Sequence, residues 1–167
     1  PPAVFFIDTE RFAPFDERQL GFEYQKREFL EGDARVSQVA DYLDDLPPEQ
    51  RVFVWLHLFG PHEPYEQHPE FKFGESDVDR YYSEIRATDE TIGKVVERFR
   101  RRSPDGIVIV TADHGEEFGD HGGRYHGSSV YEEQVRVPLI VSAPGLPVRS
   151  VEAPVQTVDL LPTVLSA

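Results

Sequence analysis

Residues 107–117 have the sequence Ile107-Val108-Ile109-Val110-Thr111-Ala112-Asp113-His114-Gly115-Glu116-Glu117. The four consecutive aliphatic residues are typical of a buried strand in a parallel sheet that is covered on both faces. Ligands of open α/β sheets bind just beyond the carboxyl ends of the strands, which is where Asp113 and His114 stand. A carboxylate beside an imidazole can ligate a divalent metal, and Gly115 allows a tight turn next to it. Because Asp and Gly are also common turn residues, this stretch alone leaves metal binding and turn formation equally open.

A second apolar run occupies residues 52–58, and a polar segment that contains His62 follows it at residues 59–65. His62 by itself is more simply a loop histidine held between Pro61 and Pro64. Because both polar segments follow buried strands, however, they are expected to converge on one edge of the sheet. The two segments together therefore favour a ligand site over two unrelated turns.

Hydrophobic periodicity along the chain predicts strands and helices in alternation. The predicted strands are residues 3–7, 51–58, 107–111 and 137–142, and the predicted helices are residues 33–46, 77–102 and 157–166. Residues 8–32 are charged and show no regular pattern. Asp33 is expected to cap the first helix, and the arginines near residue 102 suit a helix C-terminus rather than a ligand. This order predicts one α/β domain, without an internal boundary, with helices on both faces of a parallel or mixed sheet.

The composition is that of an acidic globular protein. Of the 167 residues, 39% are hydrophobic, and 31 acidic against 17 basic side chains give a net charge of −14. Such a charge disfavours nucleic acid and anionic membranes as partners. The absence of cysteine excludes disulfides, zinc–thiolate sites and a cysteine nucleophile within these residues. No apolar run approaches the roughly 20 residues that span a bilayer. Because Pro1 leads almost at once into a core strand, the chain is expected to be part of something larger.

Five segments, in their order along the chain, resemble the sulfatases, which are metal-dependent hydrolases of the alkaline phosphatase superfamily. They are Pro61-His62-Glu63-Pro64-Tyr65, residues 87–93, Thr111-Ala112-Asp113-His114-Gly115-Glu116, residues 126–141 and residues 156–165. The resemblance covers residues 51–167. It implies a three-layer α/β sandwich with a mostly parallel central sheet, like that of alkaline phosphatase, and it makes residues 1–167 the second half of the catalytic domain.

The resemblance also implies roles for four residues. Asp113 and His114 match the second pair of metal ligands in sulfatases. Many members hold calcium there, so one calcium ion is expected, with manganese or zinc as alternatives because of the imidazole. His62 matches the histidine that contacts the sulfate or the departing oxygen. His126 stands about where many members place a sulfate-binding lysine, with a spacing to Tyr131 that differs by one residue. His57 and His121 are weaker candidates. His57 lies within a strand and is expected in the core or behind the ligands, and His121 is expected to shape the glycine-rich loop.

The resemblance further implies that part of the catalytic apparatus lies elsewhere. The sulfatase nucleophile is a formylglycine made from Cys or Ser in a Cys/Ser-x-Pro-x-Arg motif, and this chain has no such motif. The first metal-binding Asp pair is expected outside the chain as well, so the chain alone is expected to be inactive. The implied substrate is a sulfate ester of a small molecule or glycan, and an extracytoplasmic location is favoured. The oligomeric state and the organic part of the substrate are not determined by the sequence.

Two other functions are compatible with the same residues. One is a phosphodiesterase, phosphonate hydrolase or phosphoethanolamine-type transferase of the same superfamily, which a threonine nucleophile would indicate. The other belongs to a different class, a non-catalytic binding domain that retains the fold. The binding domain is the less favoured of these, because a domain without catalysis has no physical need to retain all four candidate site residues. These residues are His62, Asp113, His114 and His126.

Overall fold

The computed structural model describes residues 3–7, 22, 24–27 and 30–166. Within them, strand β1 (Ala3–Ile7) lies between β2 (Tyr24–Arg27) and β3 (Phe53–Leu56), and both pairings are parallel. A second sheet consists of β4 (Val108–Thr111) and β5 (Leu139–Ser142), which pair antiparallel. Two of the three strand pairs in the described chain are therefore parallel, as a mostly parallel sheet requires.

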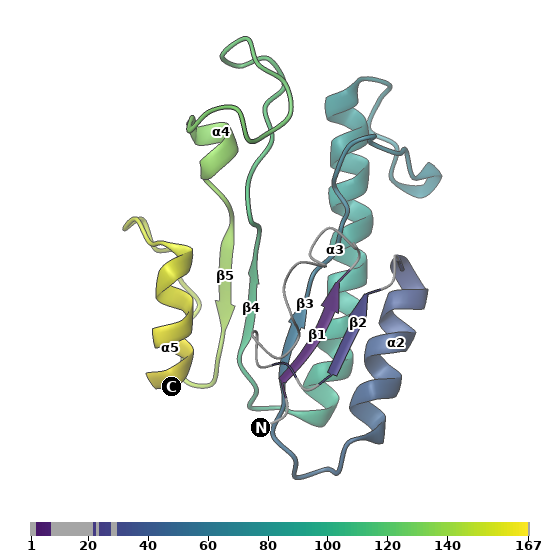
Figure 1. Cartoon of the computed structure of the whole chain (residues 1–167), viewed down its shortest axis with the longest axis vertical. Coiled ribbons are helices and arrows are strands. Elements are labelled where there is room, and N and C mark those ends of the chain that lie inside the picture. The colour runs from purple at the N-terminus through teal and green to yellow at the C-terminus, as the bar shows by residue number, and fades with distance from the viewer. Residues whose placement is uncertain (1–2, 8–21, 23, 28–29, 167) are drawn as a thin grey trace.

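Two long helices pack together and form the main core with β3. Helix α2 (Gly32–Asp45) contributes Val39 and Leu43, and helix α3 (Asp77–Arg102) contributes Val95. Val54 and Leu56 of β3 pack against this cluster, so burial of apolar side chains places both helices on the sheet. In Figure 1, α5 (Leu160–Ser166) lies at the opposite side of the view from α2. No helix in the described ranges is long and apolar enough to cross a membrane.

Helix α3 begins and ends at the residues that the sequence predicts. At its start, the Ser76 hydroxyl accepts a hydrogen bond from the Asp79 amide at 3.2 Å, and the Asp79 carboxylate accepts one from the Ser76 amide at 3.0 Å. At its end, Arg102 donates to the carbonyl oxygens of Leu43 and Leu46, each at 3.1 Å. The terminal arginine therefore holds the end of α2.

Three local predictions differ from the structure. Asp33 does not cap α2, because the N-cap residue is Glu31, whose side chain makes no capping hydrogen bond. The Asp33 carboxylate instead accepts a hydrogen bond from Lys94 of α3 at 2.8 Å. Strand β2 lies within the segment predicted to be irregular. The sequence did not predict this strand because Tyr-Gln-Lys-Arg contains no apolar run. The predicted strand at residues 107–111 is only half-buried, since β4 pairs with β5 alone among the described strands.

The remaining elements are short and connect the strands. A 3₁₀ turn, η2 (Pro69–Phe71), interrupts the segment between β3 and α3. Helix α4 (Glu132–Val135) follows the long loop after β4 and precedes β5. A second 3₁₀ turn, η3 (Thr157–Asp159), leads into α5, so the predicted helix at residues 157–166 is confirmed as two consecutive pieces. The α/β fold class is therefore confirmed, and the carboxyl ends of β3 and β4 lead into the two segments that carry the predicted site residues.

Candidate functional site

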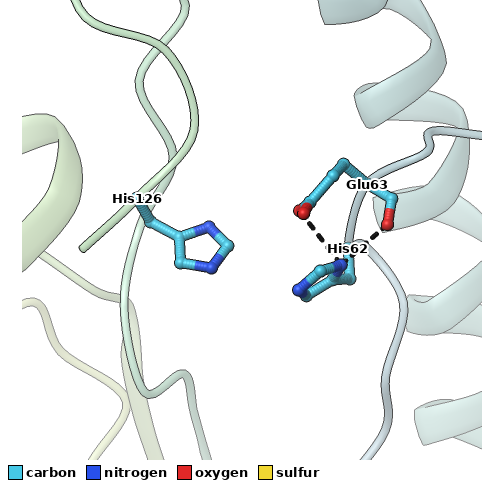
Figure 2. Close-up of side chains that lie close together, drawn as sticks. All are labelled: His62, Glu63 and His126. Atoms are coloured by element: carbon cyan, nitrogen blue, oxygen red, sulfur yellow. Dashed lines mark hydrogen bonds and ion pairs between the residues drawn. The ribbon is translucent and has the colours of Figure 1, made fainter. Parts of the chain in front are cut away.

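The segments that follow β3 and β4 bring three histidines into contact. The rings of His114 and His126 stack with 3.8 Å between their centroids and 20° between their planes. His62 lies edge-on to His126, at 5.3 Å between centroids and 74°. Figure 2 shows the ring of His126 facing that of His62 across the space between the two segments. The structure thus brings together the predicted residues His62, His114 and His126, which we call the histidine cluster.

Each histidine of the cluster has its Nδ1 atom next to an oxygen acceptor. Nδ1 of His62 and of His114 lies 2.8 and 2.9 Å from the backbone carbonyl oxygen of the following residue. Nδ1 of His126 lies 3.1 Å from a carboxylate oxygen of Glu116. Because a carbonyl or an ionised carboxylate only accepts, Nδ1 carries the proton in all three rings. In the neutral rings the Nε2 lone pair is therefore available to a metal or a substrate.

Asp113 and His114 fit the donor set of a divalent metal. Nε2 of His114 lies 3.6 Å from Oδ2 of Asp113, and the two side chains are 39% and 67% exposed. Oδ1 of Asp113 accepts the amide of His114 at 3.1 Å, which leaves Oδ2 beside the imidazole. Metal-binding histidines usually donate their other N–H to a carbonyl or carboxylate, as His114 does to the Gly115 carbonyl. These two residues can therefore hold one ion between a carboxylate oxygen and an imidazole nitrogen.

Glu63 forms a second possible ligand group with the cluster. One atom each of His62, Glu63 and His126 lies within 4.8 Å of the others, and Oε2 of Glu63 is 3.0 Å from Nδ1 of His62 (Figure 2). Phe59 stacks on the other side of His62 at 4.3 Å and limits its rotation. Glu63 stands within the quoted motif Pro-His-Glu-Pro-Tyr, but its sequence position alone did not single it out.

Gly115, directly after the candidate metal ligands, lies in close contact with helix α4. A Cβ atom on Gly115 would lie 2.1 Å from the backbone oxygen of Glu133, a distance that real Cβ atoms do not adopt. The Gly115 amide donates to the carbonyl of Gln134 at 2.8 Å. Glycine is therefore required at position 115 by close contact with α4 rather than by an unusual backbone angle.

Glu117 organises the loop between His114 and His126. Its side chain is 2% exposed, and its Oε1 accepts the amides of His121 and Gly123 at 3.1 and 2.7 Å, while Oε2 accepts Gln134 at 2.8 Å. Burial alone would raise the pKa of Glu117, but these hydrogen bonds outweigh it and lower the pKa. Since both of its oxygens accept hydrogen bonds, from the loop and from α4, Glu117 serves to fold the loop against that helix.

Tyr125, the residue before His126, adopts a backbone angle φ of +72°. A bulky residue rarely occupies this left-handed region, so the local backbone is strained. A pair of backbone hydrogen bonds with Glu117 holds it, at 2.9 and 3.0 Å. The loop thus places His126 at a defined position by fixing the residue next to it.

The two weaker histidine candidates lie outside the cluster. His121 bonds Glu133 at 2.6 Å and stacks on Tyr131 at 3.7 Å, and the bond to Glu133 raises the pKa of His121. His57 is half-buried, and burial lowers its pKa despite the opposing charge of Asp113. The structure therefore agrees with a loop-shaping place for His121 and a partly buried place for His57.

One buried contact to the cluster was not predicted from the sequence. Glu116 joins His126 to Tyr65, whose hydroxyl donates to Oε2 of Glu116 at 2.8 Å. Burial, followed by this hydrogen bond, raises the pKa of Tyr65 far above its ordinary value, so its hydroxyl keeps its proton. Both residues stand in the motifs quoted above, but their contact spans two loops and leaves no signal in the spacing.

The chain is similar in sequence to known sulfatases. The sequence profile of the sulfatase family matches residues 10–167. Among curated relatives, an uncharacterised sulfatase, YidJ of Escherichia coli K12, is 37% identical over 79 residues, which are 47% of this chain and 16% of that protein. Mouse arylsulfatase K is 31% identical over 125 residues, 71% of this chain and 22% of the relative. The matched stretches therefore cover only about a fifth of the length of these two relatives.

The fold is shared with solved structures as well. The C-terminal periplasmic domain of EcEptC from Escherichia coli superposes with a TM-score of 0.65 over 85% of this chain and 48% of that one, at 16% sequence identity. At that identity the likeness concerns the fold alone. The family match, by contrast, extends over nearly the whole chain and includes every segment that builds the histidine cluster. The chain belongs to the sulfatase family.

Proposed function

We propose that this protein hydrolyses sulfate esters with the help of a divalent metal, and that this chain supplies part of the metal site and the side chains that contact the ester. The observation that carries the proposal is the convergence of His62, His114 and His126, whose Nδ1 atoms are all held and whose Nε2 atoms are available, next to Asp113. Sulfatase family membership supports the choice of reaction.

In this proposal Asp113 and His114 bind the metal. The ion, when bound, neutralises charge on the non-bridging oxygens of the ester. Calcium is the first candidate by family resemblance, and manganese or zinc is the alternative because the donor set contains an imidazole. The exposure of both side chains leaves room for further ligands from other parts of the protein.

His62 and His126 contact the ester in this proposal. When its ring is protonated, each histidine can donate a hydrogen bond from Nε2 while Nδ1 remains on its present acceptor. His126 then shares the negative charge of the sulfate, and His62 protonates the departing oxygen. Both roles require the rings to keep their orientation. Phe59 and Glu63 hold the ring of His62, and Glu116 holds the ring of His126. The nucleophile is expected outside these residues.

A phosphate or phosphonate ester is the second candidate substrate. The observation that favours it is the imidazole of His114 where many sulfatases carry an asparagine, because imidazole suits the metals that promote phosphoryl chemistry. A tetrahedral oxyanion of either kind would meet the same histidines. The two candidate substrates are therefore distinguished by their rates of hydrolysis and not by the residues that bind them.

The experiment compares nitrocatechol sulfate with bis-nitrophenyl phosphate as substrates of the protein at its full natural length. The protein is freed of metal with a chelator and then supplied with calcium, manganese or zinc. Sulfate release that depends on one metal and is lost in both His62→Asn and His126→Asn supports the proposal. Faster release of nitrophenol from the phosphate diester would transfer the assignment to phosphoryl chemistry. Full activity after metal removal, or in both variants, would overturn it.

A further inference from the structure

A single buried carboxylate links the two loops of the site. Glu116 follows β4, and its Oε1 lies 3.1 Å from Nδ1 of His126. Its other oxygen, Oε2, accepts the hydroxyl of Tyr65 from the segment after β3 at 2.8 Å. Because each oxygen has a different partner, the carboxylate cannot rotate without breaking both hydrogen bonds. Among the described residues, these are the two side chains that Glu116 bonds.

The surroundings of Glu116 explain why this bridge is fixed. The Glu116 side chain is 4% exposed and Tyr65 is 8% exposed. A buried carboxylate is costly unless its oxygens meet donors, and here each oxygen meets one. Tyr65 is held in turn by Tyr81 and Phe118, whose ring centroids lie 5.6 and 5.5 Å from its own. The raised pKa of Tyr65 is consistent with a phenol that always donates.

The bridge determines which nitrogen of His126 faces the site. With Glu116 accepting at Nδ1, the proton of the neutral ring stays on Nδ1, and Nε2 is directed away from the carboxylate. The same ring stacks on His114 and lies edge-on to His62. A rotation of His126 would therefore disturb its contacts with both other members of the histidine cluster.

We propose that Glu116 is a positioning residue that sets the tautomer and ring orientation of His126, and that Tyr65 fixes Glu116 from the opposite loop. The inference rests on the proposed function, because it gives His126 a contact with the ester. Neither Glu116 nor Tyr65 needs to touch the substrate. Their effect on the reaction passes through His126, since preorganised donors stabilise a transition state only when their orientation is fixed in advance.

The test uses three variants of the protein at its full natural length. Glu116→Leu removes the acceptor with little change in volume, Glu116→Gln restores an acceptor, and Tyr65→Phe removes only the hydroxyl. Glu132→Gln is the matched control, because Glu132 is exposed on α4 and pairs only with Arg136 among the described residues. Nitrogen-15 spectra of the histidine side chains at one fixed pH report which nitrogen of His126 carries the proton, and the His126→Gln protein identifies its signals.

In Glu116→Leu we expect that the Nδ1–H form of His126 is no longer the dominant tautomer. We also expect kcat to fall about 10- to 100-fold, the range typical of residues that orient a metal-binding histidine. KM should change much less, because the ester is still bound by its other contacts. Glu116→Gln should recover most of the activity, and Tyr65→Phe should shift both the spectrum and kcat in the same direction by a smaller amount. Glu132→Gln should match the wild type.

The inference is overturned if Glu116→Leu keeps the Nδ1–H tautomer and the wild-type kcat. If Glu116→Leu does not fold, Tyr65→Phe decides instead, and unchanged His126 signals in that variant overturn the inference equally. Failure of the proposed function is distinguishable, since it appears as an inactive wild type. In that case the spectra still test whether Glu116 sets the tautomer of His126.

Discussion

His114 and His126 lie ring on ring, with 3.8 Å between their centroids, although one stands at the exit of β4 and the other at the far end of the loop that follows. The stack connects a candidate metal ligand directly to a candidate ester contact. Because Nδ1 of His114 is held by the Gly115 carbonyl, its Nε2 atom faces Asp113 rather than His126. The two rings can therefore act on different partners while supporting each other by contact.

Replacement of His114 by asparagine is expected to change the metal preference of the protein. An amide oxygen suits calcium, whereas imidazole suits zinc and manganese. We expect His114→Asn to weaken zinc binding by roughly tenfold or more while calcium binding is retained. Titration calorimetry of the metal-free protein measures both affinities, and His68→Asn is the control because His68 pairs with Glu84 outside both candidate ligand groups of the described residues. Unchanged zinc affinity in His114→Asn would remove His114 from the metal site.

Two glycine substitutions are expected to have opposite effects on stability. Gly115→Ala should lower the free energy of unfolding by about 1–3 kcal/mol, because its Cβ would lie 2.1 Å from the Glu133 oxygen and the backbone must shift. Gly93→Ala, on an exposed turn of α3 with nothing within 4 Å, should raise it by about 0.5–1 kcal/mol. Urea unfolding measures both. A neutral effect at Gly115 would mean that the close contact with α4 is not maintained in solution.

Glu117 is expected to make the protein sensitive to acid. Its pKa in the folded protein is below the ordinary value of 4.5, so the carboxylate contributes stability above that value and loses the contribution as the pH falls through the folded pKa. Glu117→Gln should lower stability at neutral pH and flatten its decline below pH 4.5. Melting temperatures of both proteins across the acidic range measure the difference. Parallel curves for variant and wild type would contradict the assignment.

Arg102 is expected to contribute far more to stability than its neighbour Arg101. Arg102 donates to four backbone carbonyls, at Leu43, Leu46, Pro47 and Gln50. Arg101 pairs only with Glu97 on the exposed face of α3, among the described residues. We expect Arg102→Met to lower the free energy of unfolding by about 2–3 kcal/mol and Arg101→Met by about 0.5 kcal/mol or less. Chemical denaturation of both variants compares them, and equal losses would argue against the anchoring of α2 by Arg102.

The parts of the fold that local chemistry determines were predictable. Helix α3 could be predicted to the residue because its amphipathic repeat begins at Asp77 and ends in a run of arginines at Arg102. Strand β2 could not, because its polar sequence is stabilised by pairing with β1 rather than by an apolar pattern of its own. The antiparallel pairing of β4 and β5 likewise depends on the path of the long loop between them.

The location of the candidate site was predictable, because the carboxyl ends of the predicted strands were expected to meet at one edge of the sheet. His62 and the segment that begins with Asp113 both follow predicted strands, and the rule for strand exits places them together. Glu116 and Tyr65 were not predictable, because their hydrogen bond joins residues 51 positions apart and depends on how two irregular loops pack. The strand ends thus predicted where the site lies and the family resemblance added His126, but neither indicated the contact between Glu116 and Tyr65.

The pair of backbone bonds between Glu117 and Tyr125 separates two parts of one loop. Residues 118–124 form an excursion whose two ends are joined at its base, and the amides of His121 and Gly123 within it bond the buried Glu117 carboxylate. Exchanges of its exposed side chains at constant length therefore leave these backbone bonds, and the position of His126, in place. A library of substitutions at these exposed positions, without insertions or deletions, offers a route to new selectivity around an intact histidine cluster.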